Sequence, residues 1–201
     1  MSNDITPTEQ LVEQLGQAHR LVAGFYQRIL PLFDQIAQDS VDANFWFWNP
    51  SENDRPCSSA KRPSSYWAWD YIPLFASTHA YRTWDTDQAK RDDMTLVFRL
   101  YIDNAFKKES PQRMGRKGEP DPLQMESGKA VVEVKLYRCT QNSELHFDKL
   151  WHGIPWPQPS EHWTAATQRE GIELCARDVP LAELLADPTA VTTWIKAQRG
   201  E

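Results

Sequence analysis

The sequence predicts a single α+β domain in which an antiparallel sheet packs against a long N-terminal helix and short C-terminal helices. Three observations support this: a helical apolar stripe near the N-terminus, strictly alternating segments in the middle, and two short helical segments at the end. The 201-residue chain contains no internal repeat and no convincing interdomain linker. We therefore expect one domain over residues 1–201, with a meander-like sheet of about 4–5 strands.

The N-terminal helix is predicted over residues 7–38. Thr6 is a capping residue, Pro7 suits the first helical position, and Glu9 completes a capping box. Apolar side chains then recur at steps of mostly three and four, on one face of a helix: Leu11, Leu15, Ala18, Val22, Phe25, Ile29, Leu32, Phe33 and Ile36. We expect Pro31 to kink or divide this helix, because proline lacks the backbone donor and clashes with the preceding turn.

Four segments predict the strands of the sheet. Residues 44–48 are aromatic on both faces and too short for a helix, which indicates a buried strand. Residues 65–84 look extended, with an interruption at Pro73. The segments 95–103 and 131–137 alternate apolar and polar side chains, which predicts half-buried strands with their polar faces outward.

The last quarter of the chain is mixed. Residues 146–163 combine tryptophans with prolines and are expected to form an ordered aromatic loop. Residues 171–177 predict a final strand. Two short helices follow, over 181–186 and from Asp187 onward.

Two long polar loops, 49–64 and 104–128, join the predicted strands. In an up-and-down sheet, alternate connections leave from the same end. Long loops without structure of their own are uncommon in compact domains and tend to be functional or disordered. We therefore expect these two loops to form the working end of the molecule.

Composition narrows the function classes. The formal net charge of −6 and the acidic pI of about 5.4 disfavour broad nucleic-acid binding, which needs a basic surface. Three cysteines without a CxxC pair, and histidines without metal-ligand spacing, give no reason to expect a metal or a cofactor. The N-terminus has no signal-peptide pattern and no segment has the apolar length of a membrane span. We therefore expect a cytoplasmic protein. The chain is also tryptophan-rich, with nine tryptophans.

One pattern points to catalysis. Glu133 and Lys135 stand two apart on a predicted strand, and Asp103 ends the preceding strand. An Asp followed by E-x-K on the adjacent strand resembles the core motif of the PD-(D/E)xK nuclease superfamily. The resemblance implies carboxylates that hold a divalent metal and a lysine that stabilises developing charge. The chain departs from the motif at Ile102, where the family has proline, and it lacks the helix expected after the E-x-K strand.

The same residues have a simpler interpretation. E-x-K between valines is typical of a solvated strand face, on which Arg99 and Glu133 would form a cross-strand ion pair. We favour this interpretation, so Asp103, Glu133 and Lys135 remain catalytic candidates only.

Two groups of residues are candidates for binding. The first is a basic run in the second long loop, formed by Lys107, Lys108, Arg113, Arg116 and Lys117, which could contact an acidic partner. The second is the aromatic cluster around Trp151 and Trp156. Solvated charge in the loop and structural packing of the tryptophans are the alternatives. Near the cluster, His146 and His152 are candidates for an acid–base role, with a structural role as the alternative.

Two hypotheses of function follow. The favoured one is a non-enzymatic protein-binding or regulatory protein, an inhibitor or accessory factor, which uses its long polar loops to hold another protein. The alternative is a metal-dependent nuclease built on Asp103, Glu133 and Lys135. The distance between the carboxylates of Asp103 and Glu133 discriminates the two.

Overall fold

The computed structural model describes residues 6–84, 88–144, 149 and 153–200. Within these residues, six strands form one antiparallel sheet in the order β1-β2-β3-β4-β6-β5. The strands are β1 Asn44–Pro50, β2 Ala76–Arg82, β3 Met94–Tyr101, β4 Val131–Cys139, β5 Ser160–Ala165 and β6 Ile172–Pro180. The helices are α1 Pro7–Val41, α3 Leu181–Ala186 and α4 Pro188–Arg199, with 3-10 turns η1 Pro63–Ser65, η2 Ala68–Tyr71 and η3 Asn104–Phe106. The predicted α+β class with an antiparallel sheet is confirmed, and the sheet has slightly more strands than predicted.

The sheet is a meander only as far as β4. Strand β6 lies between β4 and β5, so the chain leaves β4, passes the position of β6 and returns through a β5–β6 hairpin. The sequence does not predict β5: the expectation of a loop over the whole of 146–163 is wrong from Ser160 onward, where this strand begins. Among the described strands, β5 pairs only with β6; its register shifts between Ser160 and Thr164, and its residues are half-buried or exposed. An edge strand of this kind lacks the alternation that identifies a buried strand.

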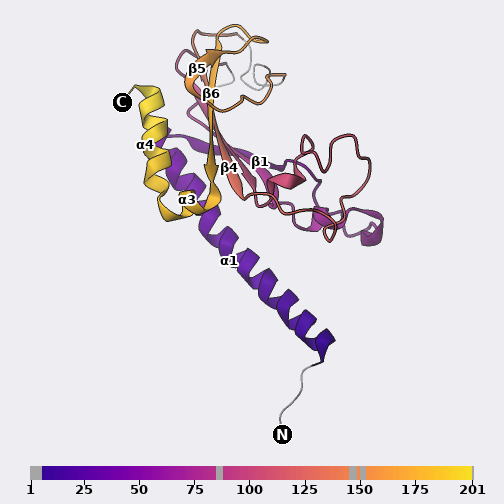
Figure 1. Ribbon diagram of the computed structural model, residues 1–201. Helices are drawn as coiled ribbons and strands as arrows, with labels where there is room; N and C mark the ends of the chain where they lie inside the picture. The colour runs from indigo at the N-terminus through magenta and orange to yellow at the C-terminus, as the bar shows by residue number, and fades with distance from the viewer. Residues whose placement is uncertain (1–5, 85–87, 145–148, 150–152, 201) are drawn as a thin grey trace.

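One face of the sheet is covered by helices. Helices α1 and α4 lie side by side across it, and α3 connects β6 to α4 (Figure 1). The apolar stripe of α1 meets the apolar side chains of the central strands, and the rings of Phe33 and Phe98 stack with centroids 4.5 Å apart. We call this the helical face. Its core follows directly from the helical and alternating periodicities.

Helix α1 continues through Pro31, so the predicted kink or division there is wrong. Pro31 and Gln27, whose carbonyl loses its helical donor, are both exposed, and water can satisfy that carbonyl. The first part of the helix, residues 7–24, projects from the body and is exposed along its whole length (Figure 1).

The prediction of an extended segment over residues 65–84 is also wrong in its first half. Residues 63–65 and 68–71 form the turns η1 and η2, and the strand begins only at Ala76. The aromatic residues there pack as a turn: Trp69 contacts Phe75 and Phe106 with ring centroids 4.9 and 4.4 Å apart. The final strand and the two short C-terminal helices are confirmed as β6, α3 and α4.

Candidate binding site on the open face of the sheet

The face opposite the helices, which we call the open face, carries a row of polar side chains. Asn49, Thr78, Arg99, Glu133 and Asp178 stand directly opposite one another on five neighbouring strands, β1, β2, β3, β4 and β6. Directly opposite residues in a sheet share a face, so the row crosses the sheet at one level. The expected ion pair between Arg99 and Glu133 is confirmed, with 3.1 Å between Nη1 and Oε2.

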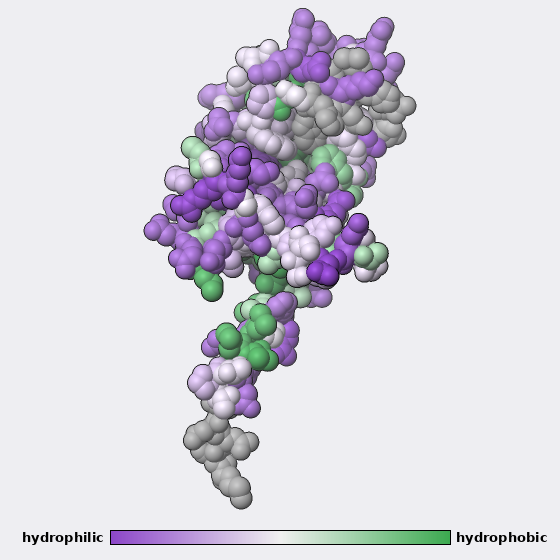
Figure 2. All heavy atoms as spheres, turned by 90° about the vertical axis from the view of Figure 1, so that its right-hand side faces the viewer, coloured by the Kyte–Doolittle hydropathy of each residue, from purple (hydrophilic) through white to green (hydrophobic). Residues whose placement is uncertain are grey.

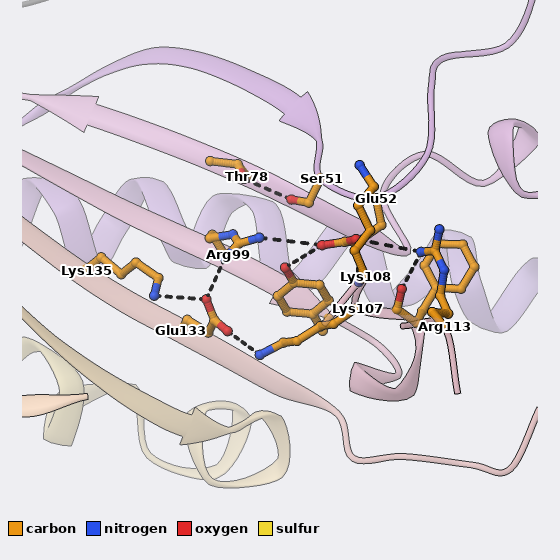
Figure 3. A network of polar contacts seen from close by, with 11 residues as sticks. Ser51, Glu52, Thr78, Arg99, Lys107, Lys108, Arg113, Glu133 and Lys135 are labelled. Carbon is orange, nitrogen blue, oxygen red and sulfur yellow. Dashed lines mark hydrogen bonds and ion pairs between the residues drawn. The ribbon is translucent and has the colours of Figure 1, made fainter. Parts of the chain in front are cut away.

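Glu133 is the centre of this network. Its carboxylate contacts Arg99, Lys107 and Lys135, and Lys135 Nζ lies 3.1 Å from Oε2 (Figure 3). Burial alone would raise the pKa of Glu133, but Lys135, Lys107 and Arg99 together hold that pKa below its usual 4.5. The carboxylate therefore stays ionised inside the protein, and the prediction that this strand face is solvated is wrong: Glu133 is 5% exposed.

A second carboxylate ties the two long loops to the sheet. Glu52, from the loop after β1, accepts hydrogen bonds from the hydroxyl of Tyr101 on β3 and from the backbone N–H of Lys108, each at 3.0 Å. Its oxygens also lie 3.6 Å from Arg99 and 3.7 Å from Arg113 (Figure 3). Loop residues from both connections thus meet at the same end of the sheet, as an up-and-down arrangement of β1 to β4 predicts.

The loops are fixed to each other further out as well. Trp69, in the turn η2, donates its indole N–H to the carbonyl of Pro120 at 2.8 Å. The carboxylate of Glu119 accepts hydrogen bonds from the backbone N–H groups of Ala68 and Trp69. The segments 51–75 and 102–130 therefore form one ordered unit, which we call the loop end.

Lys135 and Asp178 border the network on its other side. Lys135 is 3% exposed and donates to the carbonyl of Pro157 at 3.0 Å. Burial lowers the pKa of Lys135 and Glu133 opposes that change. Burial, followed by the neighbouring charge of Glu133, raises the pKa of Asp178 above its usual 3.8. The contact to Pro157 places the segment between β4 and β5 over the open face.

Two hollows meet on this face at Arg99 and Trp156. One, of about 530 Å³, is lined by Trp46 and Phe47 together with polar groups of the row; the other, of about 390 Å³, lies over Glu133 and Asp178. Trp46 and Phe47 are adjacent in sequence yet line the same hollow, because the register of β1 shifts between Phe45 and Phe47. Trp156 is 39% exposed and its ring centre lies 4.5 Å from the guanidinium carbon of Arg99.

The predicted basic run does not act as a unit. Lys107 turns inward to Glu133, and Arg113 turns inward to Glu52 and the carbonyl of Phe106. Lys108, Arg116 and Lys117 are exposed. The run thus divides into two side chains that hold the loop in place and three that face solvent.

The structure does not bring Asp103 to Glu133. Asp103 begins the turn η3, and its carboxylate accepts hydrogen bonds from the backbone N–H groups of Ala105 and Gly128, each at 2.9 Å. Arg99 is the residue opposite Glu133, so Asp103 lies four positions further along, roughly 13 Å away at the usual strand rise. Two carboxylates in this arrangement cannot share one metal ion.

Within the residues that the structure describes, no group of three or more His, Cys, Asp or Glu side chains is arranged to hold a metal ion. No helix in those ranges is both long and apolar enough to cross a membrane. Trp151, His146 and His152 lie outside the described residues.

Several residues of the site were not predicted: Glu52, Thr78, Tyr101 and Asp178. Three of them carried a usable signal: Thr78 and Tyr101 lie within the predicted strand segments 65–84 and 95–103, and Asp178 stands next to the predicted strand 171–177. Glu52 lies in a polar loop where an acidic side chain is ordinary, and only its long-range contacts to β3 distinguish it.

The fold and the site define an open-faced antiparallel α+β domain whose polar face is organised by buried ion pairs. The chain belongs to the PM0109 family, whose model matches residues 6–199. The comparison with curated proteins and the comparison with solved structures found no match.

Proposed function

We propose that this chain is a non-enzymatic binding protein of the regulatory kind, an inhibitor or accessory factor, which holds another protein at its loop end. One observation carries the proposal. The inner parts of the two long loops are fixed by buried ion pairs and hydrogen bonds, while their outer parts expose apolar and basic side chains.

The exposed side chains of the loop end are those that protein interfaces favour. From segment 51–75 of the loop end, Tyr66 is 41% and Tyr71 44% exposed; from segment 102–130, Met114 is 66% and Leu123 89% exposed. Tyrosine, methionine and arginine are enriched at interfaces relative to the rest of a protein surface. Large apolar side chains held in water favour association when a partner covers them.

The two loops are already ordered in the single chain, which favours a role in binding a partner over a role as simple connections between strands. Glu52 joins both loops to Tyr101, and Glu119 joins the second loop to the turn η2. A surface that is ordered before binding loses less conformational entropy when a partner arrives. If the loops were flexible, the entropy lost on ordering them would offset much of the favourable free energy of binding.

The partner we propose is a protein with an acidic or mixed surface. Arg116 and Lys117 are adjacent and exposed near the tip of the second loop, and Lys108 is exposed at its base. Charges at the rim of an interface increase the rate of encounter and set the orientation of the partner. Trp156, on the neighbouring open face, adds an aromatic contact at the edge of the same surface.

We place this activity in the cytoplasm. Cys57, Cys139 and Cys175 form no disulfide, as is usual in a reducing compartment. Burial raises the pKa of Cys139 and of Cys175 to about 12, so neither is a reactive thiolate at neutral pH.

Affinity capture from lysate of the source cells tests the proposal with a matched pair of variants. Arg116→Glu/Lys117→Glu reverses two exposed charges at the loop end. Lys90→Glu/Arg91→Glu reverses the same two charge types in the turn between β2 and β3, where both side chains are exposed at the other end of the sheet. We expect one stoichiometric protein to be captured by wild type and by the Lys90/Arg91 variant, and lost with the Arg116/Lys117 variant. Equal capture by both variants would refute the loop end as the binding surface.

A further inference from the structure

The projecting part of α1 leaves an apolar stripe in water. Within residues 7–24, Leu11 is 65%, Leu15 57% and Val22 43% exposed. Figure 1 shows this part of the helix extending away from the sheet, and Figure 2 shows hydrophobic side chains gathered on it. Further along the same helix, the continuation of the stripe is buried against the sheet at Ile29 and Phe33.

The spacing of the stripe is that of a coiled coil. Leu11, Leu15, Ala18 and Val22 follow one another at steps of four, three and four, and Phe25 continues the series into the body. An average step of 3.5 residues keeps a seam facing a second helix along its whole length. A helix that only covered its own sheet would need no such seam beyond the body.

The charged side chains of the segment avoid the seam. Glu9, Glu13 and Arg20 lie on the side of the helix opposite Leu11 and Val22, as helical geometry of 3.6 residues per turn requires. A second helix could therefore cover the stripe without burying an ion. The polar side also lacks the row of lysines and arginines that helices lying on membranes use.

The segment is poorly equipped to stand alone as a helix. Gly16 and Gly24 each weaken a helix interior by about 1 kcal/mol relative to alanine. A carbon atom added at Gly24 would meet nothing within 4 Å, and one at Gly16 would meet only the side chain of Arg20, so packing within the chain gives no reason for either glycine. A short helix without tertiary contacts is marginal in water.

We propose that residues 7–24 of α1 pair with the same segment of a second copy of this chain, in an antiparallel two-helix seam. When Leu11 is set opposite Val22 of the other copy, Leu15 falls opposite Ala18, so both layers pair a leucine with a smaller side chain. The same alignment sets residue 9 opposite residue 24.

The length of the projection agrees with this alignment. The overlap spans residues 9–24 in each copy and ends where Phe25 begins to pack on the body. The exposed segment is roughly 27 Å long at the helical rise, so each helix end reaches the body of the other copy. Val12 and Leu21, 63% and 75% exposed, then flank the seam.

Sedimentation velocity of the full chain over a dilution series tests the pairing. We expect wild type to have twice the chain mass at high concentration. Leu15→Glu, which places one charge from each copy in the seam, should raise the dissociation constant at least about 100-fold. Arg20→Glu, on the opposite side of the helix, should leave it within a few-fold. At concentrations below both dissociation constants, where each variant is a single chain, the circular dichroism melts of the two variants should agree, because residues 15 and 20 are both exposed there.

A monomer at every concentration, or a dimer that survives Leu15→Glu, would overturn the proposal. The orientation is tested with nitroxide labels at Gln10 or at Gln17 in a Cys57→Ser background, the other two cysteines being buried. The antiparallel register predicts a short separation between the two Gln17 labels and an axial offset of about 20 Å between the two Gln10 labels. Equal short separations at both positions would overturn the antiparallel arrangement.

Discussion

The two faces of the sheet are buried by different means at their centres, although further out the open face also packs apolar side chains such as Val97 and Tyr137. The helical face is covered by α1 and α4, and its core is made of aliphatic and aromatic side chains such as Phe98 and Val134. The open face buries Arg99, Glu133 and Lys135 in a network of ion pairs at the centre of the sheet. Strands β3 and β4 supply both faces, since alternate residues point to opposite sides.

This difference suggests two roles: the helical face stabilises the domain, and the open face positions the loop end. Apolar packing on the helical face stabilises the domain but tolerates changes of shape that conserve volume. A buried charge network contributes little net stability compared with apolar packing, yet removing one partner is costly. Because Lys107 and Glu52 belong to the loops, the open-face network determines where the loop end sits relative to the sheet.

The largest effect is expected from neutralising the centre of the network. Glu133→Gln leaves Arg99, Lys107 and Lys135 buried without their shared carboxylate, and should lower the free energy of unfolding by about 3–5 kcal/mol. Urea unfolding at pH 7 measures this. Asp178→Asn is the matched control on the next strand: because the pKa of Asp178 is raised, its charge is already disfavoured, and the change should stay within about 0.5 kcal/mol.

A loss for Glu133→Gln no larger than for Asp178→Asn would contradict the central role of Glu133. The pH dependence gives a second check. The folded-state pKa of Glu133 lies below its unfolded value, so its stabilising effect is present above pH 4.5 and is lost as the pH falls through the folded-state pKa.

A smaller, pH-dependent effect is expected on the helical face. His79 is 4% exposed, lies beside Phe33, and bonds Ser77 through Nε2 at 2.9 Å. Burial lowers the pKa of His79 from 6.5 to about 4, and the charge of Asp34 opposes this only in part. As the pH falls from 6.5 to 4 the unfolded state takes up the proton first, so about 3 kcal/mol of stability should be lost.

His79→Phe should abolish that loss. Urea unfolding at pH 7 and at pH 4 measures it as a change in the stability difference between variant and wild type, which should move by about 3 kcal/mol in favour of the variant at pH 4. A stability difference that is the same at both pH values would show that His79 is not held neutral by burial.

An intermediate test addresses the link between loops and sheet. Tyr101→Phe removes the hydroxyl that donates to Glu52 and should cost about 1–2 kcal/mol. Because Glu52 also receives the N–H of Lys108, we expect faster amide hydrogen exchange in residues 102–130 and unchanged exchange in α4. Equal acceleration in both regions would mean that Glu52 does not act locally on the loops.

The smallest effect on stability is expected at the tips of the loops. Arg116→Glu/Lys117→Glu and Lys90→Glu/Arg91→Glu should each change the free energy of unfolding by less than about 0.5 kcal/mol, since all four side chains are exposed. Thermal melts in parallel measure this. A large loss for the Arg116/Lys117 variant would show that these residues hold the loop rather than face a partner.

The sequence was most informative where periodicity alone determines structure. The capping box at Thr6, the stripe of α1 and the alternation in β3 and β4 follow from local geometry. The Arg99–Glu133 pair follows once the two alternating strands are taken as neighbours. Prediction failed where contacts between distant segments decide. Trp69 packs against Phe106 and turns a strand-like segment into η2, and β5 exists only as an edge partner of β6.

The site shows the same limit. Glu133 and Lys135 were identified from their spacing, but the covering loops, which bury them, cannot be inferred from the strand itself. Glu52 and Lys107 lie far apart in sequence and meet the open face only because the connections after β1 and β3 leave from one end of the sheet. The position of Asp103 at the end of a strand made it a catalytic candidate, but in the structure its carboxylate caps the turn η3.

Site-specific photo-crosslinking in the source cells tests the central claim, that the loop end is the surface that holds a partner protein. A photoreactive amino acid is placed at Leu123, 89% exposed in the second loop, or at Arg91 in the exposed turn at the other end of the sheet. We predict one discrete crosslinked protein from position 123 and none from position 91. No crosslink at position 123, or the same products from both positions, would contradict the account.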